Sequence, residues 1–186
     1  MAPPRNSGGR LTADDWIDAG FAALAEGGPN GLRVDRLCER LHVTKGSFYW
    51  HFADTSAYRN ELIKAWGSLR DRNRREFERM PDVDPRDRLR VMMQTWVAPE
   101  QWRLESAMRE WALTDDAVLA SVQQSDARIL RTIRRAFLDC GFDRADAALR
   151  AFVVFSAGVG LLHSTDSAPA APPDVRDRFL RFMLRP

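Results

Sequence analysis

Apolar residues recur at helical spacing along almost the whole chain. Between Thr12, a good N-cap, and Gly27 they line one face of a predicted helix. A short helix follows over 34–41, a second short one over 44–51, and a longer one begins after Asp54. No segment alternates apolar and polar residues long enough to predict a strand. The pattern therefore predicts an all-α protein of about nine helices.

The helical pattern is interrupted by a Pro- and Asp-rich cluster at 80–85 and then resumes in longer elements. One long helix runs past Phe137 and is closed by Gly141. The next, through Leu162, is apolar nearly all round, which in a soluble protein predicts burial on more than one side. A Pro/Ala/Ser connector at 163–173 leads to a last amphipathic helix.

Composition adds few constraints. The chain has 186 residues, 45% hydrophobic and 29% charged, which are ordinary values for a folded globular protein. Its net charge of +2 is too small to indicate nucleic-acid binding by itself. The longest apolar run, 151–162, is shorter than the roughly 20 residues that span a bilayer, and we identify no secretion signal or disulfide framework. We expect a cytoplasmic location and no membrane partner.

Two short helices joined at His42–Val43 form a helix-turn-helix, which lays its second helix in the major groove of DNA. The run 31–52, GLRVDRLCERLHVTKGSFYWHF, resembles the DNA-binding domain of the TetR family of bacterial transcriptional regulators. Its ending, VTxGSFYxHF, looks like that family's signature, and the likeness covers residues 11 to 62. The predicted organisation is a flexible arm (1–10), a helix-turn-helix domain (11–55), a connecting helix (56–80) and a helical dimerisation and ligand-binding domain (81–186).

The types of side chain in this segment suit DNA recognition. Lys45 is the best candidate for a contact to guanine, whereas Tyr49 and His51 suit phosphate oxygens. The candidate DNA-binding residues are Arg33, Arg36, Thr44, Lys45, Gly46, Ser47, Tyr49, Trp50, His51 and Thr55. Two of them depart from the family pattern: Arg33 replaces the usual Ser or Thr cap, and Thr55 the usual lysine. Residues 1–55 carry six basic and seven acidic residues, so we expect weak nonspecific binding.

The resemblance implies a second domain that dimerises and often holds an effector. Methionine and aromatic side chains, with two polar residues, suggest an apolar pocket, although such stripes are equally common in plain cores. The predicted pocket residues are Met92, Met93, Trp96, Trp102, Met108, Trp111, Gln123, Asp126, Phe137 and Phe152. Small residues in the apolar 151–162 run suggest a two-fold helical interface. The predicted dimer residues are Phe155, Gly158, Val159, Leu162, Val175, Phe179 and Met183.

Other classes of function have less support. We expect no enzyme, because no nucleophile, base and orienting group cluster in the sequence. Cys38 and His42 are four residues apart, but two ligands are too few for a zinc site, so we expect neither metal nor cofactor. The sequence thus favours a homodimeric repressor, released from a palindromic DNA operator by a small, largely apolar effector. The alternatives are a constitutive or activating regulator, or a helical small-molecule-binding protein that has lost DNA binding.

Overall fold

The computed structural model describes residues 11–80, 83–96, 99–162 and 173–185. Over these ranges the chain forms nine α-helices, one 3-10 helix and no strand, which confirms the predicted fold class. The α-helices are α1 (Ala13–Gly27), α2 (Val34–Leu41), α3 (Lys45–His51), α4 (Thr55–Glu78), α5 (Pro85–Trp96), α6 (Pro99–Trp111), α7 (Asp116–Asp139), α8 (Arg144–Leu162) and α9 (Pro173–Met183). The 3-10 helix, η1 (Gly28–Leu32), connects α1 to α2.

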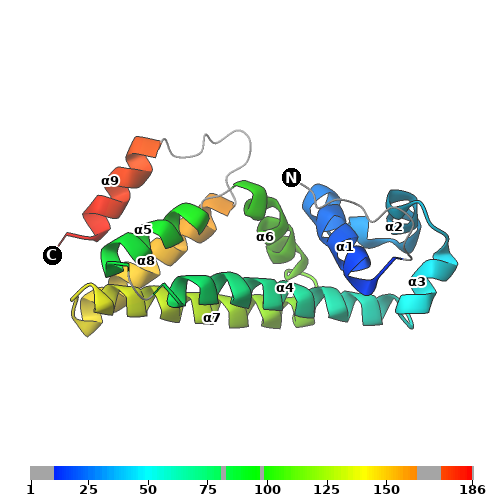
Figure 1. Ribbon diagram of the computed structural model, residues 1–186, viewed down its shortest axis with the longest axis horizontal. Helices are drawn as coiled ribbons and strands as arrows, with labels where there is room; N and C mark the ends of the chain where they lie inside the picture. Colours follow the sequence, from blue (N-terminus) through cyan, green and yellow to red (C-terminus); the bar gives the residue numbers. More distant parts are fainter. Residues whose placement is uncertain (1–10, 81–82, 97–98, 163–172, 186) are drawn as a thin grey trace.

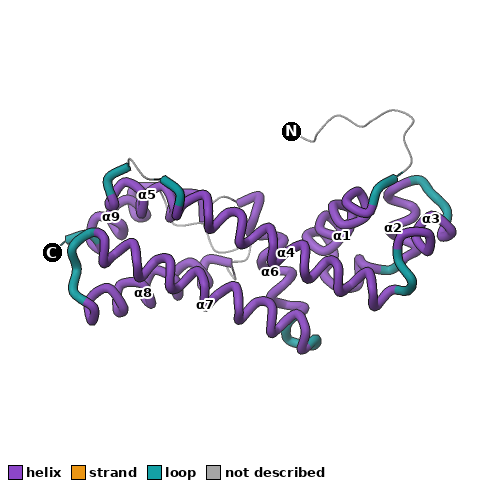
Figure 2. The backbone as a smooth tube through the Cα atoms, turned by 60° about the horizontal axis from the view of Figure 1, so that its bottom comes forward, coloured by secondary structure: helices purple, strands orange, loops and turns teal. Residues whose placement is uncertain are grey.

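The two longest helices, α4 and α7, lie side by side and form the long axis of the molecule (Figure 1). Helices α1 to α3 gather at one end of α4, and α5, α8 and α9 gather at the other. Helix α6 lies between the two groups and contacts α1, η1, α7 and α8. Figure 2 shows the same arrangement from a second direction. Helix α4 therefore links the helix-turn-helix end to the rest of the protein.

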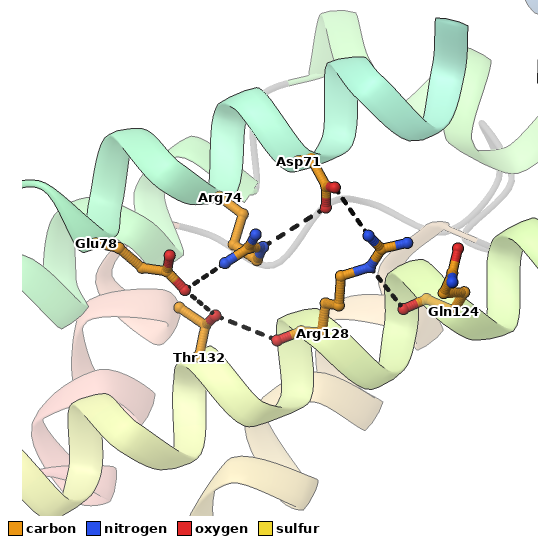
Figure 3. A network of polar contacts seen from close by, with 6 residues as sticks. All are labelled: Asp71, Arg74, Glu78, Gln124, Arg128 and Thr132. Atoms are coloured by element: carbon orange, nitrogen blue, oxygen red, sulfur yellow. Dashed lines mark hydrogen bonds and ion pairs between the residues drawn. The ribbon is translucent and has the colours of Figure 1, made fainter. Parts of the chain in front are cut away.

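Polar side chains join α4 to α7 along their contact (Figure 3). Arg128 of α7 donates to Asp71 of α4 at 2.8 Å. One turn further along, the Thr132 hydroxyl donates to Glu78 at 2.9 Å, and Arg74 pairs with the same carboxylate. These contacts hold the two helices in one register, although partly exposed ion pairs of this kind contribute little stability each.

Side-chain caps explain where several helices begin. Thr12 and Asp15 form a capping box at the start of α1. Asp54 accepts from the Ala57 amide at 2.7 Å, and Asp143 accepts from the amides of residues 145 and 146. These caps lie where the sequence predicts breaks between helices.

Within the described ranges the buried side chains form two hydrophobic cores, and the border between these cores does not follow the predicted domain boundary near residue 80. The first core contains Trp16, Phe48 and Tyr58 from the helix-turn-helix end, but also Met108 and Trp111 of α6. The second core is built from α4, α5, α7, α8 and the end of the chain. Helix α6 therefore shares a core with the helix-turn-helix domain.

Helix α8 buries only a narrow face of Ala147, Ala151 and Val154. Its opposite face is apolar but exposed: we call it the α8 stripe, and it consists of Leu149, Phe152, Val153, Ser156, Ala157 and Gly160. By length and composition alone α8 could cross a membrane, as can the core helices of many soluble proteins. Within this single chain, the predicted burial of α8 on more than one side is not reached.

Candidate DNA-binding surface and effector cavity

The turn between α2 and α3 is closed by a residue in the left-handed conformation. His42 has φ 56° and ψ 44°, and the next amide, of Val43, donates to the Cys38 carbonyl at 3.0 Å. His42 is the non-glycine residue with positive φ in the described chain. Thr44 precedes α3 in an extended conformation, and its side chain makes no capping hydrogen bond.

Helix α3 is fixed from its inner side by an aromatic cluster. Phe48 is fully buried, and its ring lies edge-on to Trp16 of α1 and Tyr58 of α4, with centroids 5.3 and 5.2 Å away. Phe52 completes the cluster, and the Tyr58 hydroxyl donates to the Trp16 carbonyl at 2.8 Å. Burial raises the pKa of Tyr58, so this donor stays protonated. Phe48 and Phe52 are thus the inward-facing pair of this segment.

The outer face of α3 carries the predicted DNA-contacting side chains. Tyr49 and Trp50 are 54% and 62% exposed, and Lys45 is exposed beside them. The Trp50 ring meets the His51 ring edge-on at 4.6 Å. Such large exposed aromatic side chains on a helix with a rigid inner face are unusual unless they meet a partner.

The flanking candidates are placed less favourably. Arg33 makes a two-pronged contact with Asp35, with its Nη2 2.9 Å from the carboxylate. The hydrogen bond from Arg33 is the main reason why the pKa of Asp35 is lowered to about 2. Arg33 is therefore engaged within its own helix, whereas Arg36 is exposed. Thr55 is exposed at the start of α4.

A small cavity of about 40 Å³ lies between α4, α6, α7 and α8. Its lining comprises Arg70, Trp102, Glu105, Arg109, Ile129, Phe155, Gly158, Val159 and Leu162. Behind it Arg109 donates twice to Asp126, at 2.7 and 2.9 Å, and its Nη2 lies 2.9 Å from Glu105. Burial alone lowers the pKa of Arg109, but the hydrogen bond to Asp126 and the two carboxylate charges raise it above its ordinary value.

Most of the predicted pocket residues lie elsewhere. Trp102 lines the cavity, while Asp126 acts through Arg109. Four of the predicted pocket residues are instead buried in the two cores: Met92, Met108, Trp111 and Phe137. Gln123 is exposed, Phe152 is 61% exposed on the α8 stripe, and the side chains of Met93 and Trp96 lie outside the described residues. The reason is that aromatic and sulfur-containing stripes at helical spacing pack equally well in a dry core.

The predicted dimer residues on α8 are also placed differently. Phe155, Gly158, Val159 and Leu162 turn toward the cavity rather than outward. On α9, Val175 is 46% exposed, but Phe179 is partly buried and Met183 is buried in the second core. An all-round apolar helix offers no polar face that would fix its orientation from sequence, and the dimer interface stays a prediction.

The charged residues of the cavity were not predicted. Glu105 and Arg109 fall on the same face of α6 as the apolar Met108, and Ala112 follows just after the helix. A Glu/Arg pair four residues apart within an apolar stripe is the signal that could have identified them.

Residues 17–57 match the family model described as bacterial regulatory proteins, tetR family. A search of curated proteins finds no match. Among solved structures, a transcriptional regulator from Rhodococcus sp. Rha1 is similar, with a TM-score of 0.69, 18% identity and 94% of both chains covered. Salmonella enterica GusR has a TM-score of 0.69 at 16% identity, covering 94% of this chain and 97% of its own. The regulatory protein TetR from Rhodobacter sphaeroides has a TM-score of 0.63 at 21% identity, covering 92% and 96%.

The helix-turn-helix with its exposed α3 face, joined to a helical second half, is the architecture of a DNA-binding transcriptional regulator. The resemblance predicted from sequence is confirmed: the helix-turn-helix segment matches the tetR family model, and the chain as a whole has the fold of TetR-family transcriptional regulators.

Proposed function

We propose that the protein is a homodimeric repressor that binds a palindromic operator and is released from it by a small effector. The observation that carries the proposal is the outer face of α3, where Lys45, Tyr49 and Trp50 are exposed on a helix fixed by buried Phe48. A recognition helix binds DNA more specifically when its inner face is held rigidly, because contacts to base edges require a defined position of the helix.

The proposed roles follow from the chemistry of each side chain. Lys45 donates to guanine in the major groove, and Trp50 and Ser47 are secondary readers. Tyr49 and His51 donate to phosphate oxygens and set the register, with Arg36 on a flanking phosphate. Thr44, Gly46 and Thr55 lie at the approach to the backbone of the duplex. Trp50 also gives the duplex an apolar surface that suits the thymine methyl group.

Selection of bound duplexes from a random library tests the DNA-binding role. We expect enrichment of an inverted repeat. Tyr49→Ala should weaken binding without changing the selected sequence, whereas Lys45→Ala should also change base preference at the contacted positions. Arg131→Ala, on the exposed surface of α7, is the control. No enrichment by a folded protein would contradict the proposal.

The dimer is proposed to form through the α8 stripe, joined by Val175 and Phe182 of α9. Phe152, Phe182 and Leu149 are each more than 60% exposed, and a patch of this kind usually meets a partner. Leu149→Glu should give a species with the mass of one chain, 21.2 kDa, in sedimentation experiments at micromolar concentration. The matched control is Leu113→Glu, since Leu113 is 83% exposed outside the stripe. If both variants stay dimeric, the interface lies elsewhere.

The effector is proposed to enter the cavity between α4, α6, α7 and α8, and the protein to act in the cytoplasm, where TetR-family regulators work. A ligand that fits only one arrangement of these helices shifts the population of dimers away from the DNA-binding form. A second candidate is a ligand-binding protein with little DNA affinity, favoured by the Arg33–Asp35 pair and the excess of acidic residues over 1–55. The duplex selection separates the two.

A further inference from the structure

The lining of the cavity combines a charged wall and an apolar wall. Arg70, Glu105 and Arg109 come from α4 and α6, while Phe155 and Val159 of α8 face them. Asp126 lies behind Arg109 and belongs to the same group of charges. The guanidinium groups of Arg70 and Arg109 pair with the carboxylates of Glu105 and Asp126, so these four side chains are neutral as a whole. A neutral set offers no surplus charge for an ionic ligand.

Hydrogen bonding within this set is incomplete. Glu105 is only 5% exposed, and its Oε1 is ion-paired with Arg109 Nη2 at 2.9 Å but keeps acceptor capacity that no further donor uses. The Nε atom of Arg70 is buried, lies 3.5 Å from Glu105 Oε2, and donates no hydrogen bond. A buried acceptor and a buried donor thus stand close together on one wall, and unmade hydrogen bonds of buried groups are costly.

We propose that this cavity binds an uncharged molecule that carries a hydroxyl or amide group on a small aromatic or aliphatic body. The group donates to Glu105 Oε1 and accepts from Arg70 Nε, and the body packs against Phe155, Val159 and Leu162. The inference rests on the proposed effector role of the cavity and names the chemical class of its ligand. An anion or a cation would bring a buried charge without a counter-charge, and a hydrocarbon would offer no hydrogen bond to the Arg70 Nε donor or to the remaining acceptor capacity of Glu105.

The size of the cavity adds a consequence. A volume of about 40 Å³ is far below the several hundred Å³ of an ordinary small-molecule site. The polar head of the ligand fits the cavity as it stands, and the body must separate α6 from α8. Met108 and Trp111 of α6 belong to the core around Trp16. A ligand in the cavity that displaces α6 therefore changes the packing of the helix-turn-helix end.

The experiment uses the full chain without DNA and four probes of similar shape at pH 7. These are 4-ethylphenol, ethylbenzene, 4-ethylbenzoate and 4-ethylbenzylammonium, and binding is measured by calorimetry. We expect 4-ethylphenol to bind about tenfold or more tightly than each of the others, the effect of one hydrogen bond to a charged group.

Two variants sharpen the test. Glu105→Gln gives the four groups a net positive charge, so 4-ethylbenzoate should become the preferred probe and 4-ethylphenol should weaken about tenfold. Glu110→Gln changes the same charge at an exposed position of α6 and should leave the order unchanged. Gly158→Leu places a side chain in the cavity and should abolish binding of all four probes. The variant should still fold, since a Cβ at Gly158 meets no atom within 4 Å.

Several results would overturn the inference: tighter binding of either ion or of ethylbenzene to the natural chain, no probe binding at millimolar concentration, or unchanged binding by Gly158→Leu. If Glu105→Gln fails to fold, the order of the four probes and Gly158→Leu still decide. The proposed function is judged separately, by operator affinity with and without 4-ethylphenol. Binding without an effect on the operator supports the ligand class and refutes the effector role.

Discussion

Gly20 marks the closest approach of α1 to α4. A Cβ atom at this position would lie 2.3 Å from the Tyr58 Oη and 2.8 Å from the Leu62 Cδ2. The Leu62 methyl is the end of a flexible side chain and can move. The Tyr58 hydroxyl cannot move freely, because its ring is buried and it donates to the Trp16 carbonyl at 2.8 Å. Gly20→Ala should therefore displace Tyr58 and break this hydrogen bond.

Two opposing effects decide the sign. Replacing a glycine inside a helix by alanine gains about 1 kcal/mol of helix propensity. Overpacking of a core costs about 1–3 kcal/mol, and the lost hydrogen bond adds about 1 kcal/mol. We expect Gly20→Ala to lower the free energy of unfolding by about 1–3 kcal/mol. Gly158→Ala is the matched control, since its Cβ meets nothing within 4 Å and should raise stability by up to about 1 kcal/mol.

Urea denaturation at one fixed protein concentration measures both changes, because dimerisation would make stability depend on concentration. Tyr58→Phe removes the hydroxyl that the new methyl would meet. In a double-mutant cycle, Gly20→Ala should therefore cost about 1 kcal/mol less in the Tyr58→Phe background. Equal stabilisation by Gly20→Ala and Gly158→Ala, with no coupling to Tyr58, would refute this reasoning.

Four further predictions concern single side chains. Asp35→Asn should release Arg33 to contact a phosphate and so tighten nonspecific DNA binding. The slope of log binding constant against log salt concentration should steepen by about 0.9 for each added phosphate contact. An unchanged slope would show that Arg33 does not reach the duplex. In Arg33→Ala the pKa of Asp35 should move from about 2 toward the ordinary value of 3.8, as followed by NMR titration. Because the pKa is depressed in the folded protein, the Arg33–Asp35 pair contributes stability above about pH 4, and this contribution is lost as the pH falls toward 2. His42→Gly should raise the free energy of unfolding by about 1 kcal/mol through relief of the left-handed strain, with destabilisation in urea as the contrary result. Arg109→Met should cost about 3 kcal/mol in the same assay, because partly buried Asp126 would lose its counter-charge and buried Glu105 would keep only the longer contact with Arg70. A neutral effect would contradict the ion-pair network.

Much of the helical framework could be predicted from sequence, because its signals are local. Thr12, Asp54 and Asp143 stand at helix starts, and Gly141 follows the end of α7 with φ 90°. Cap residues act through the backbone within a few positions of themselves, so a sequence pattern contains them completely.

The cavity and the free face of α8 depend on contacts between distant segments. Glu105 of α6 meets Arg70 of α4, and Asp126 of α7 meets Arg109. No periodicity within one helix indicates which neighbours will face it. Helix α8 is the extreme case, since its apolar residues on all sides left its rotation undetermined, and Phe152 and Phe155 exchanged their expected places.

The core that α6 shares with α1 has a consequence for protein engineering. Met108 and Trp111 are buried against the helix-turn-helix end, so a fragment ending near residue 80 would expose the surface that they cover. A chimera that transplants the DNA-reading head onto another sensor must therefore carry the C-terminal half of α6, or a redesigned equivalent. The unit that carries the helix-turn-helix and its complete core is therefore discontinuous in sequence, because it includes part of α6. A fragment cut near residue 80 would lose part of this core.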